Sequence, residues 1–301
     1  MRAWTFLGMI AILQTLVVGQ EQILFERELE AIGSEYGVTV GVAAKDMNTG
    51  ESVFYHADSL FPTASVIKLP VLVELFNRFH DGRLSPLQPM MLHDSLRKPG
   101  SGVLQFLQSG QTLKLIDIAT LMIILSDNTA TNYVIDQFAS DHEQKLEAVN
   151  SRMRSLGLEH TKLLNRLYSP ETKKKTVEAR RFGIGVSCPR DMVLLLEKLV
   201  KGDVIGPRAS DSIIAIMRNQ FYLEGAPRWL PFMEDTTLWV ANKTGSLDDR
   251  KIDVGIVGSA RGKYVYVIFC DRSKDLGEQM DNKATLAIAK ISRRIYDRFM
   301  K

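Results

Sequence analysis

The chain has 301 residues, of which 45% are hydrophobic and 24% charged, a balance typical of a globular protein and not of a disordered, fibrous or multi-span membrane protein. A formal net charge of +3 is too weak to indicate a nucleic-acid-binding surface or a polybasic membrane anchor. Two cysteines are too few for a disulfide scaffold or a multi-cysteine metal site.

The first element is an apolar run at the N-terminus. Arg2 supplies one positive charge, residues 3–18 are mostly apolar, and the run ends at Gly19. These features are typical of a secretory signal peptide, and the run is too short for a membrane-spanning helix of about 20 apolar residues. We expect residues 1–19 to be removed, leaving a secreted or periplasmic chain with no stable membrane span.

An oxidising compartment raises the question of whether the two cysteines pair. Cys188 precedes a proline, and Cys270 ends a strand-like run. We predict two buried thiols, because free cysteine is among the most buried residue types. A disulfide between the two cysteines is the alternative.

The two ends of the chain carry similar patterns. At the start, helical spacing predicts a helix over residues 22–33, and strand-like segments flank a turn at residues 48–50. At the end, β-branched and aromatic residues predict three strands, followed by a helix over residues 281–300. The predicted strands are residues 38–44, 51–56, 237–242, 252–259 and 263–270.

The middle of the chain carries almost only helical signals. The clearest predicted helices are residues 113–125, 128–138, 143–156 and 189–199. The sequence therefore predicts an α+β fold, with one five-stranded antiparallel sheet assembled from both ends and flanked by the terminal helices. Its sheet domain would be discontinuous, over residues 20–62 and 217–301, around a helical domain over residues 63–216.

Ser65 and Lys68 form a candidate nucleophile and base. They stand three residues apart at the start of an apolar helical run, so the Lys68 ammonium can reach the Ser65 hydroxyl. A lysine of depressed pKa can take the serine proton, and the helix N-terminus favours a developing oxyanion. The spacing alone is weak, because Ser95 and Lys98 repeat it and chance supplies it roughly once in such a chain.

Two further motifs follow in order. Ser-Asp-Asn at residues 126–128 interrupts an apolar helix, and Lys-Thr-Gly at residues 243–245 ends a predicted strand. The ordered set Ser-x-x-Lys, Ser-Asp-Asn and Lys-Thr-Gly resembles the signature of class A β-lactamases and penicillin-binding proteins. The flanking residues 61–65 and 100–104 are similar to that family too, and the resemblance covers about residues 22–300.

The resemblance implies a β-lactamase/transpeptidase-like fold and a role for each motif. Ser65 would attack the amide carbonyl of a β-lactam or a D-alanyl-D-alanine peptide, with Lys68 taking its proton and Ser126 passing one to the departing nitrogen. The other residues would bind substrate. Asn128 would bind the acylamino group, Lys243 and Thr244 would bind the carboxylate, and Gly245 would let the strand edge approach the substrate closely. The backbone N–H groups of Ser65 and Ser246 would hold the oxyanion.

A second cation beyond the Lys-Thr-Gly motif would be Arg250 or Lys251, of which Arg250 is our choice, in a turn about one residue shorter than the family's.

We expect no cofactor and no metal, because the five histidines form no spaced pair of the metal-ligand kind. The expected partner is a small β-lactam or D-alanyl-D-alanine peptide, without nucleic acid, and the expected state is a monomer.

One departure from the family pattern concerns the Ω loop. Class A β-lactamases carry a glutamate there that activates the hydrolytic water, and the matching position in this sequence holds Leu167. Leucine cannot take a proton, so we consider Glu171, brought into place by a gapped register, as a possible deacylation base, with Glu178 as another. Without such a base, the site resembles the penicillin-binding proteins on this scaffold that act as D-alanyl-D-alanine carboxypeptidases.

Three functions therefore stay open: a β-lactamase-like serine hydrolase that turns over, a peptidoglycan D,D-peptidase that β-lactams inhibit, and a covalent sensor without turnover. The basic run at residues 173–175, with Arg180 and Arg181, is most simply a solvated loop face. Contact with anionic cell-wall polymers is the alternative for that run.

Overall fold

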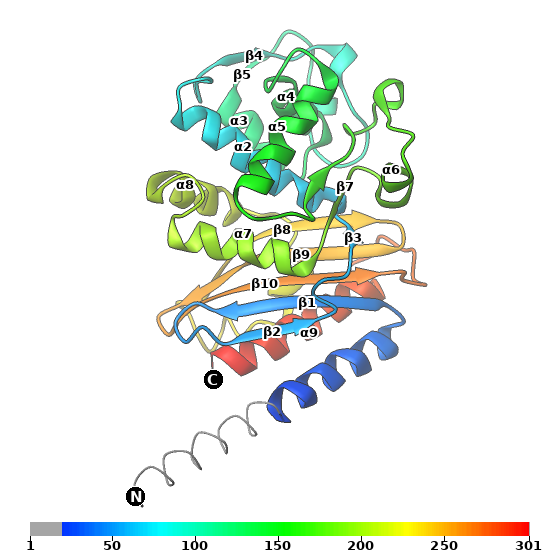
Figure 1. Cartoon of the computed structure of the whole chain (residues 1–301), viewed down its shortest axis with the longest axis vertical. Helices are drawn as coiled ribbons and strands as arrows, with labels where there is room; N and C mark the ends of the chain where they lie inside the picture. Colours follow the sequence, from blue (N-terminus) through cyan, green and yellow to red (C-terminus); the bar gives the residue numbers. More distant parts are fainter. Residues whose placement is uncertain (1–19, 301) are drawn as a thin grey trace, which may run out of the picture.

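A five-stranded antiparallel sheet lies at the centre of the molecule, with the strand order β2-β1-β10-β9-β8 (Figure 1). The computed structural model describes residues 20–300, so the expected signal peptide lies outside the described residues. The strands are β1 (Thr39–Asp46), β2 (Ser52–Tyr55), β8 (Trp239–Leu247), β9 (Arg250–Ser259) and β10 (Gly262–Asp271). The α+β class and the sheet assembled from both ends are confirmed.

Both faces of the sheet are covered, which explains why its strands are almost continuously apolar. On β10, Tyr264, Tyr266 and Ile268 join the core under the terminal helices, whereas Val265 and Val267 join the core under the helical part. Successive side chains of a strand point to opposite faces, so a strand buried on both faces needs apolar residues at every position.

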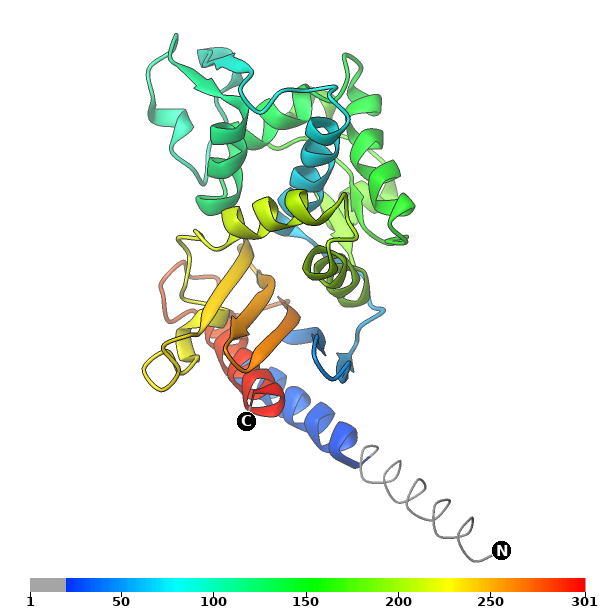
Figure 2. The same ribbon diagram turned by 90° about the vertical axis from the view of Figure 1, so that its left-hand side faces the viewer.

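The terminal helices cover one face and α7 (Pro189–Lys201) covers the other (Figures 1 and 2). Residues 20–36 are helical and bury Phe25 and Leu29 in the same core as α9 (Lys283–Phe299). Helix α7 contacts β1 and β10, so the helical part and the sheet share one continuous core.

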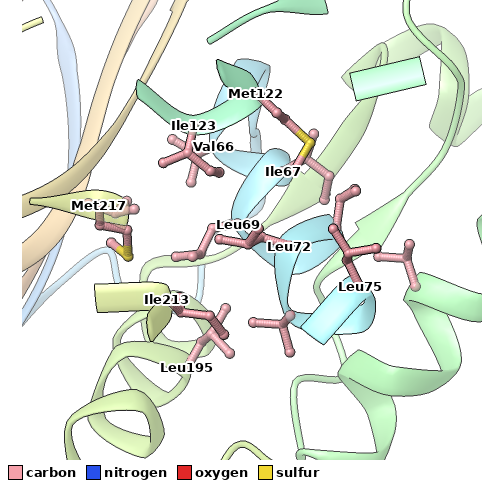
Figure 3. Packing of buried hydrophobic residues seen from close by; sticks show 14 of the residues in the cluster. Val66, Ile67, Leu69, Leu72, Leu75, Met122, Ile123, Leu195, Ile213 and Met217 are labelled. Carbon is pink, nitrogen blue, oxygen red and sulfur yellow. The ribbon is translucent and has the colours of Figure 1, made fainter. Parts of the chain in front are cut away.

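The helical part is built around α2 (Lys68–His80). Figure 3 shows Leu69, Leu72 and Leu75 of this helix packed against side chains from α3, α7 and α8. Because α2 is apolar almost all round, it forms the centre of a helical layer. The other helices are α3 (Leu115–Ile124), α4 (Asn128–Asp136), α5 (His142–Ser155), α6 (Val177–Phe182) and α8 (Pro207–Met217).

Short elements connect these helices. Two small sheets are formed by β3 (Phe61–Pro62), β7 (Gly185–Ser187) and β6 (Lys162–Leu163), and by β4 (Pro89–Met91) and β5 (Thr112–Lys114). The 3-10 turns are η1 (Ala64–Ile67), η2 (Asp94–Leu96), η3 (Leu104–Phe106), η4 (Pro170–Thr172) and η5 (Ala226–Trp229).

Two elements differ from the prediction where local sequence is a poor guide. Strand β8 runs on through Lys243, Thr244 and Gly245 to Leu247, because pairing with β9 holds polar residues in the sheet. The helical run predicted at Ser65 begins as the 3-10 turn η1 and becomes α-helical only at Lys68. Both differences lie in the motifs, where the tertiary setting overrides local propensity.

Cys188 and Cys270 are both buried and unpaired, as predicted. Over residues 20–300, the helices lack the combination of length and apolar character needed to cross a bilayer.

Candidate active site

A cavity of about 740 Å³ brings the three motifs together at the edge strand β8. Its walls include Ser65 from η1, Ser126 and Asn128 from the α3–α4 junction, and Thr244 from β8. Lys68 and Lys243 lie beneath this surface and are completely buried. Ser65 and Thr244, which are 179 positions apart in the sequence, therefore line the same cavity.

Ser65 occupies the second position of η1 and is half-buried at the cavity wall. The preceding residue, Ala64, has a φ of 44°, a left-handed conformation that is uncommon for a residue with a Cβ. Within residues 20–300, the Ser65 side chain makes no hydrogen bond, so its hydroxyl is available to a ligand. Strained backbone next to an available nucleophile is typical of functional sites.

The Lys68 ammonium is held by three oxygen atoms. Its Nζ donates to the Ser126 carbonyl oxygen at 2.6 Å, to Asn128 Oδ1 at 2.8 Å and to Ser126 Oγ at 3.2 Å. The expected direct bond to Ser65 is not among these contacts, since a fully buried ammonium needs three acceptors and finds them at the Ser-Asp-Asn motif. Lys68 therefore links the nucleophile's helix to that motif.

Ser126 stands between the two buried lysines. Its Oγ accepts from Lys68 Nζ and from Lys243 Nζ, the latter at 3.1 Å, and its φ is 52°. A hydroxyl has two acceptor lone pairs and one proton, so two ammonium donors leave the proton free to point at a ligand. This arrangement suits Ser126 for donating a proton and recovering one from a lysine.

Burial lowers the pKa of both lysines, and repulsion by Lys243 adds to the effect at Lys68. Burial, together with the Lys243 charge, holds the pKa of Lys68 well below its usual range. Burial lowers the pKa of Lys243 to about 7, although Asp253 opposes that fall. The pKa of Asp253 is itself raised by burial, to about 6. A lysine able to accept a proton near neutral pH is thus built into the site.

Asp127 holds the Ser-Asp-Asn motif in place. Its carboxylate accepts from Ala130 N at 2.8 Å as the N-cap of α4, and from Val103 N and Leu104 N at 2.7 and 2.8 Å, while only 1% of the residue is exposed. These bonds tie α4 to the loop that carries Ser101, whose Oγ donates to the Ser126 carbonyl.

Asp127→Ala is expected to lower the free energy of unfolding by about 3 kcal/mol, because it strands buried N–H groups and removes a helix cap. Urea denaturation of the whole chain measures this change. Asp211→Ala, at an exposed position of α8, is the matched control, with an expected change within about 0.5 kcal/mol. Equal effects of the two substitutions would contradict the proposed anchoring role.

Successive side chains of the Lys-Thr-Gly segment point to opposite faces of β8. Lys243 points toward Ser126, whereas Thr244 lies opposite Asp253 in the register and lines the cavity. A Cβ at Gly245 would lie 3.0 Å from the Thr63 carbonyl oxygen, so the glycine allows β8 to lie close to η1. Ser246 follows at the exposed end of the same wall.

The cation beside this segment is Lys251 and not Arg250. Arg250 forms ion pairs with Asp249 and Asp271 and does not line the cavity. Lys251 lines it and donates to Ser246 Oγ at 2.6 Å and to Glu278 at 3.2 Å. Neighbouring residues of a strand point to opposite faces, so a one-residue choice in the turn changes which cation reaches the site.

The Ω loop places Leu167 at the cavity and Glu171 away from it. Leu167 is 3% exposed, and the Asn132 side chain binds its backbone at both ends, accepting from the N–H at 3.1 Å and donating to the carbonyl at 2.7 Å. Glu171 lies exposed in η4, outside the cavity walls, and Glu178 pairs with Lys162 at 2.9 Å. The gapped register that would bring Glu171 inward is therefore not adopted.

Ser101 and Tyr168 are among the wall residues that the sequence did not single out. Ser101 lies in a segment noted only for its similarity to the family, and Tyr168 is an aromatic residue in a loop, a position without a periodic signal. Among residues 20–300, His, Cys, Asp and Glu side chains do not gather in threes as metal ligands do.

Comparison with known proteins identifies the family. Residues 24–299 match the family model Beta-lactamase2, described as the β-lactamase enzyme family. A β-lactamase of Streptomyces lavendulae is 29% identical over 225 residues, which cover 73% of this chain and 68% of the relative. The β-lactamase regulatory protein BlaB of Streptomyces cacaoi is 24% identical over 305 residues, covering 90% and 96%.

A solved structure of PBP-A, a Leu-to-Glu variant in an acyl-enzyme complex with penicillin G, superposes with a TM-score of 0.78 at 26% identity, covering 92% of this chain and 96% of PBP-A. The fold is that of the class A β-lactamases and PBP-like proteins. The chain belongs to the β-lactamase enzyme family and is a hydrolase of the serine β-lactamase kind.

Proposed function

We propose that the protein is a serine D,D-peptidase that cleaves acyl-D-alanyl-D-alanine peptides and that β-lactams acylate without efficient turnover. The observation that carries this proposal is the buried Leu167 at the cavity wall, with its backbone fixed by Asn132. The deacylation glutamate of class A β-lactamases has no counterpart at that place. The β-lactamase activity considered first on the sequence thus becomes the alternative.

The acylation step uses the groups already positioned. Ser65 Oγ attacks the amide carbonyl carbon while its proton passes to neutral Lys68, and the oxyanion is held by the backbone N–H groups of Ser65 and Ser246. When the C–N bond breaks, Ser126 gives its proton to the departing nitrogen and regains one from the lysines bound to its Oγ. The products are a seryl ester and a free amine.

Substrate orientation follows from the ends of the cavity. Thr244 lines the cavity and would bind the carboxylate that both D-alanyl-D-alanine and a penicillin carry, with the charge of the buried Lys243 beneath it and Lys251 as a nearby cation. Asn128 presents its side-chain amide to the acylamino group, and its Oδ1 also accepts a hydrogen bond from Lys68 Nζ. The same contacts thus recognise a peptide substrate and a β-lactam inhibitor.

The two kinds of acyl-enzyme should differ in lifetime for a simple chemical reason. After cleavage of the peptide, D-alanine leaves and opens the way for a water molecule. After β-lactam opening, the amine stays tethered to the acyl group, and Leu167 offers no base to activate a water from the opposite side. The likeness to PBP-A, whose Leu-to-Glu variant was captured as an acyl-enzyme with penicillin G, supports acylation of this chain by penicillins.

Two assays of the purified mature protein separate the candidates. With a chromogenic cephalosporin, we expect a burst of one equivalent and a persistent adduct mass, and with an acyl-D-alanyl-D-alanine peptide, we expect release of D-alanine. Steady cephalosporin hydrolysis at a rate typical of enzymes would contradict the proposal and favour a β-lactamase.

The likeness to BlaB over nearly the full length of both chains favours a second candidate, a covalent sensor. A sensor would form the same adduct and release no D-alanine from the peptide.

We further propose that the chain acts as a monomer in a secreted or periplasmic location, in keeping with the exported β-lactamase family. Its N-terminal run supplies the expected signal.

Acylation is expected to show a bell-shaped dependence on pH. The rate rises as Lys68 loses its proton, at a pH well below the usual lysine pKa, and falls as Lys243 loses its own near its pKa of about 7, because neutral Lys243 no longer attracts a carboxylate. Second-order acylation rates over a wide pH range measure both limbs. Lys243→Arg keeps its charge and should move the alkaline limb upward, and an unmoved limb would contradict this assignment.

A further inference from the structure

The Asn128 end of the cavity differs in character from the Lys-Thr-Gly end. Among the described lining residues, every charged side chain lies between residues 224 and 278, on the side of Thr244. The lining residues beside Asn128 are uncharged and include Gly100, Ser101 and Tyr168. The part of the site that would receive the acyl group of a substrate therefore carries no charged side chain among the described lining residues.

Tyr168 and Tyr222 are the aromatic residues among the described residues that line the cavity, and the geometry of Tyr168 is unusual. Its φ is 46°, a left-handed conformation that tyrosine rarely adopts, and 57% of the residue is exposed beside the buried Leu167. An exposed ring on a strained backbone gains little from the folded core. Such an outlier points to a role toward a ligand.

A hydrogen bond to the Tyr168 backbone and a close approach of its hydroxyl to Gly100 locate the side chain. Lys98 Nζ donates to the Tyr168 carbonyl oxygen at 3.2 Å, which ties the Ω loop to the segment before Gly100. At Gly100 a Cβ would lie 3.2 Å from the Tyr168 hydroxyl oxygen and 2.8 Å from Asn128 Nδ2. The glycine thus makes room for both groups, and the tyrosine side chain lies beside the amide expected to hold the acylamino group.

From this placement we propose that Tyr168 determines specificity for the acyl group: the site prefers substrates whose reacting amide carries an apolar or aromatic acyl substituent, which packs on the Tyr168 ring. This inference rests on the proposed acylation of Ser65 and names the substrate class of the same site. Tyr168 takes no part in proton transfer.

The test compares two penicillins that differ only in the acyl group. Benzylpenicillin carries a phenylacetyl group, and aminopenicillanic acid is the same nucleus without it. We expect Tyr168→Ala to lower the second-order acylation rate for benzylpenicillin about tenfold, the scale of one aromatic contact, and to leave the rate for aminopenicillanic acid unchanged. Tyr168→Phe keeps the ring and should keep the preference.

Two further variants guard against a change in the loop itself. Tyr168→Asn lacks the ring but suits a left-handed φ, so it should show the same selective loss as the alanine variant. Phe106→Ala removes an aromatic residue that is 78% exposed on η3 and outside the cavity wall, and should change neither rate.

The outcomes are distinct. A selective loss in both ring-less variants supports the proposal. An equal fall for both penicillins assigns Tyr168 to loop support alone and overturns it, as does an unchanged preference. If the wild-type protein is acylated by neither compound, the proposed function itself is wrong and the inference falls with it.

Discussion

The Leu167→Glu variant is expected to hydrolyse benzylpenicillin about a hundredfold faster than the wild-type protein, the scale of general-base catalysis by one positioned group. Leu167 lines the cavity, and its backbone is held by Asn132 through contacts that do not involve the leucine side chain. A carboxylate introduced there would face the acyl-enzyme and could activate a water. Steady-state hydrolysis and the decay of the adduct mass measure the gain.

The control for this variant is Glu171→Gln. Glu171 is exposed in η4 and outside the cavity wall, so its loss should leave turnover unchanged in either background. If Leu167→Glu hydrolysed benzylpenicillin no faster than the wild type, Leu167 would not occupy the position of the family's glutamate. If Glu171→Gln slowed hydrolysis, the loop would bring Glu171 to the site in solution.

Ser65→Ala is expected to abolish formation of the covalent adduct, since it removes the oxygen that attacks the carbonyl. The intact mass after incubation with benzylpenicillin measures this directly. The chain offers a matched control in its second Ser-x-x-Lys, because Ser95 lies exposed in η2, outside the cavity wall. Ser95→Ala should label as the wild type does, and an adduct that survives Ser65→Ala would overturn the assignment of the site.

The sequence was a good guide wherever periodic apolar residues meet a buried surface. Strands β9 and β10 and helices α7 and α9 lie within about two residues of their predicted ranges, because one or both of their faces pack into the shared cores. Helix α6 gave no such signal, since its six residues lie in a polar loop and bury only Ala179 and Phe182. Hydrophobic periodicity cannot predict such short elements, because they are stabilised by tertiary contacts and span too few residues to show a period.

For the site, the motifs supplied the residues and the structure supplied their relations. Ser65, Lys68, Ser126 and Lys243 were predicted to act together, yet the convergence of both ammonium groups on Ser126 Oγ depends on distances that no spacing reveals. The choice between Arg250 and Lys251 depended on strand register, which a single turn residue reverses.

The pairing of β1 with β10 has a consequence for how the chain acquires its reactivity. Strand β1 pairs on one side with the neighbouring hairpin strand β2, but Thr39 lies opposite Asp271, so β1 gains its second partner only when one of the last segments has been synthesised. Contacts of such sequence separation form slowly and leave a strand edge open in the meantime. Because β8, which carries Lys243, joins the sheet through β9 and β10, a nascent or truncated chain has no complete site. Penicillin labelling of Ser65 would therefore report completed folding, molecule by molecule.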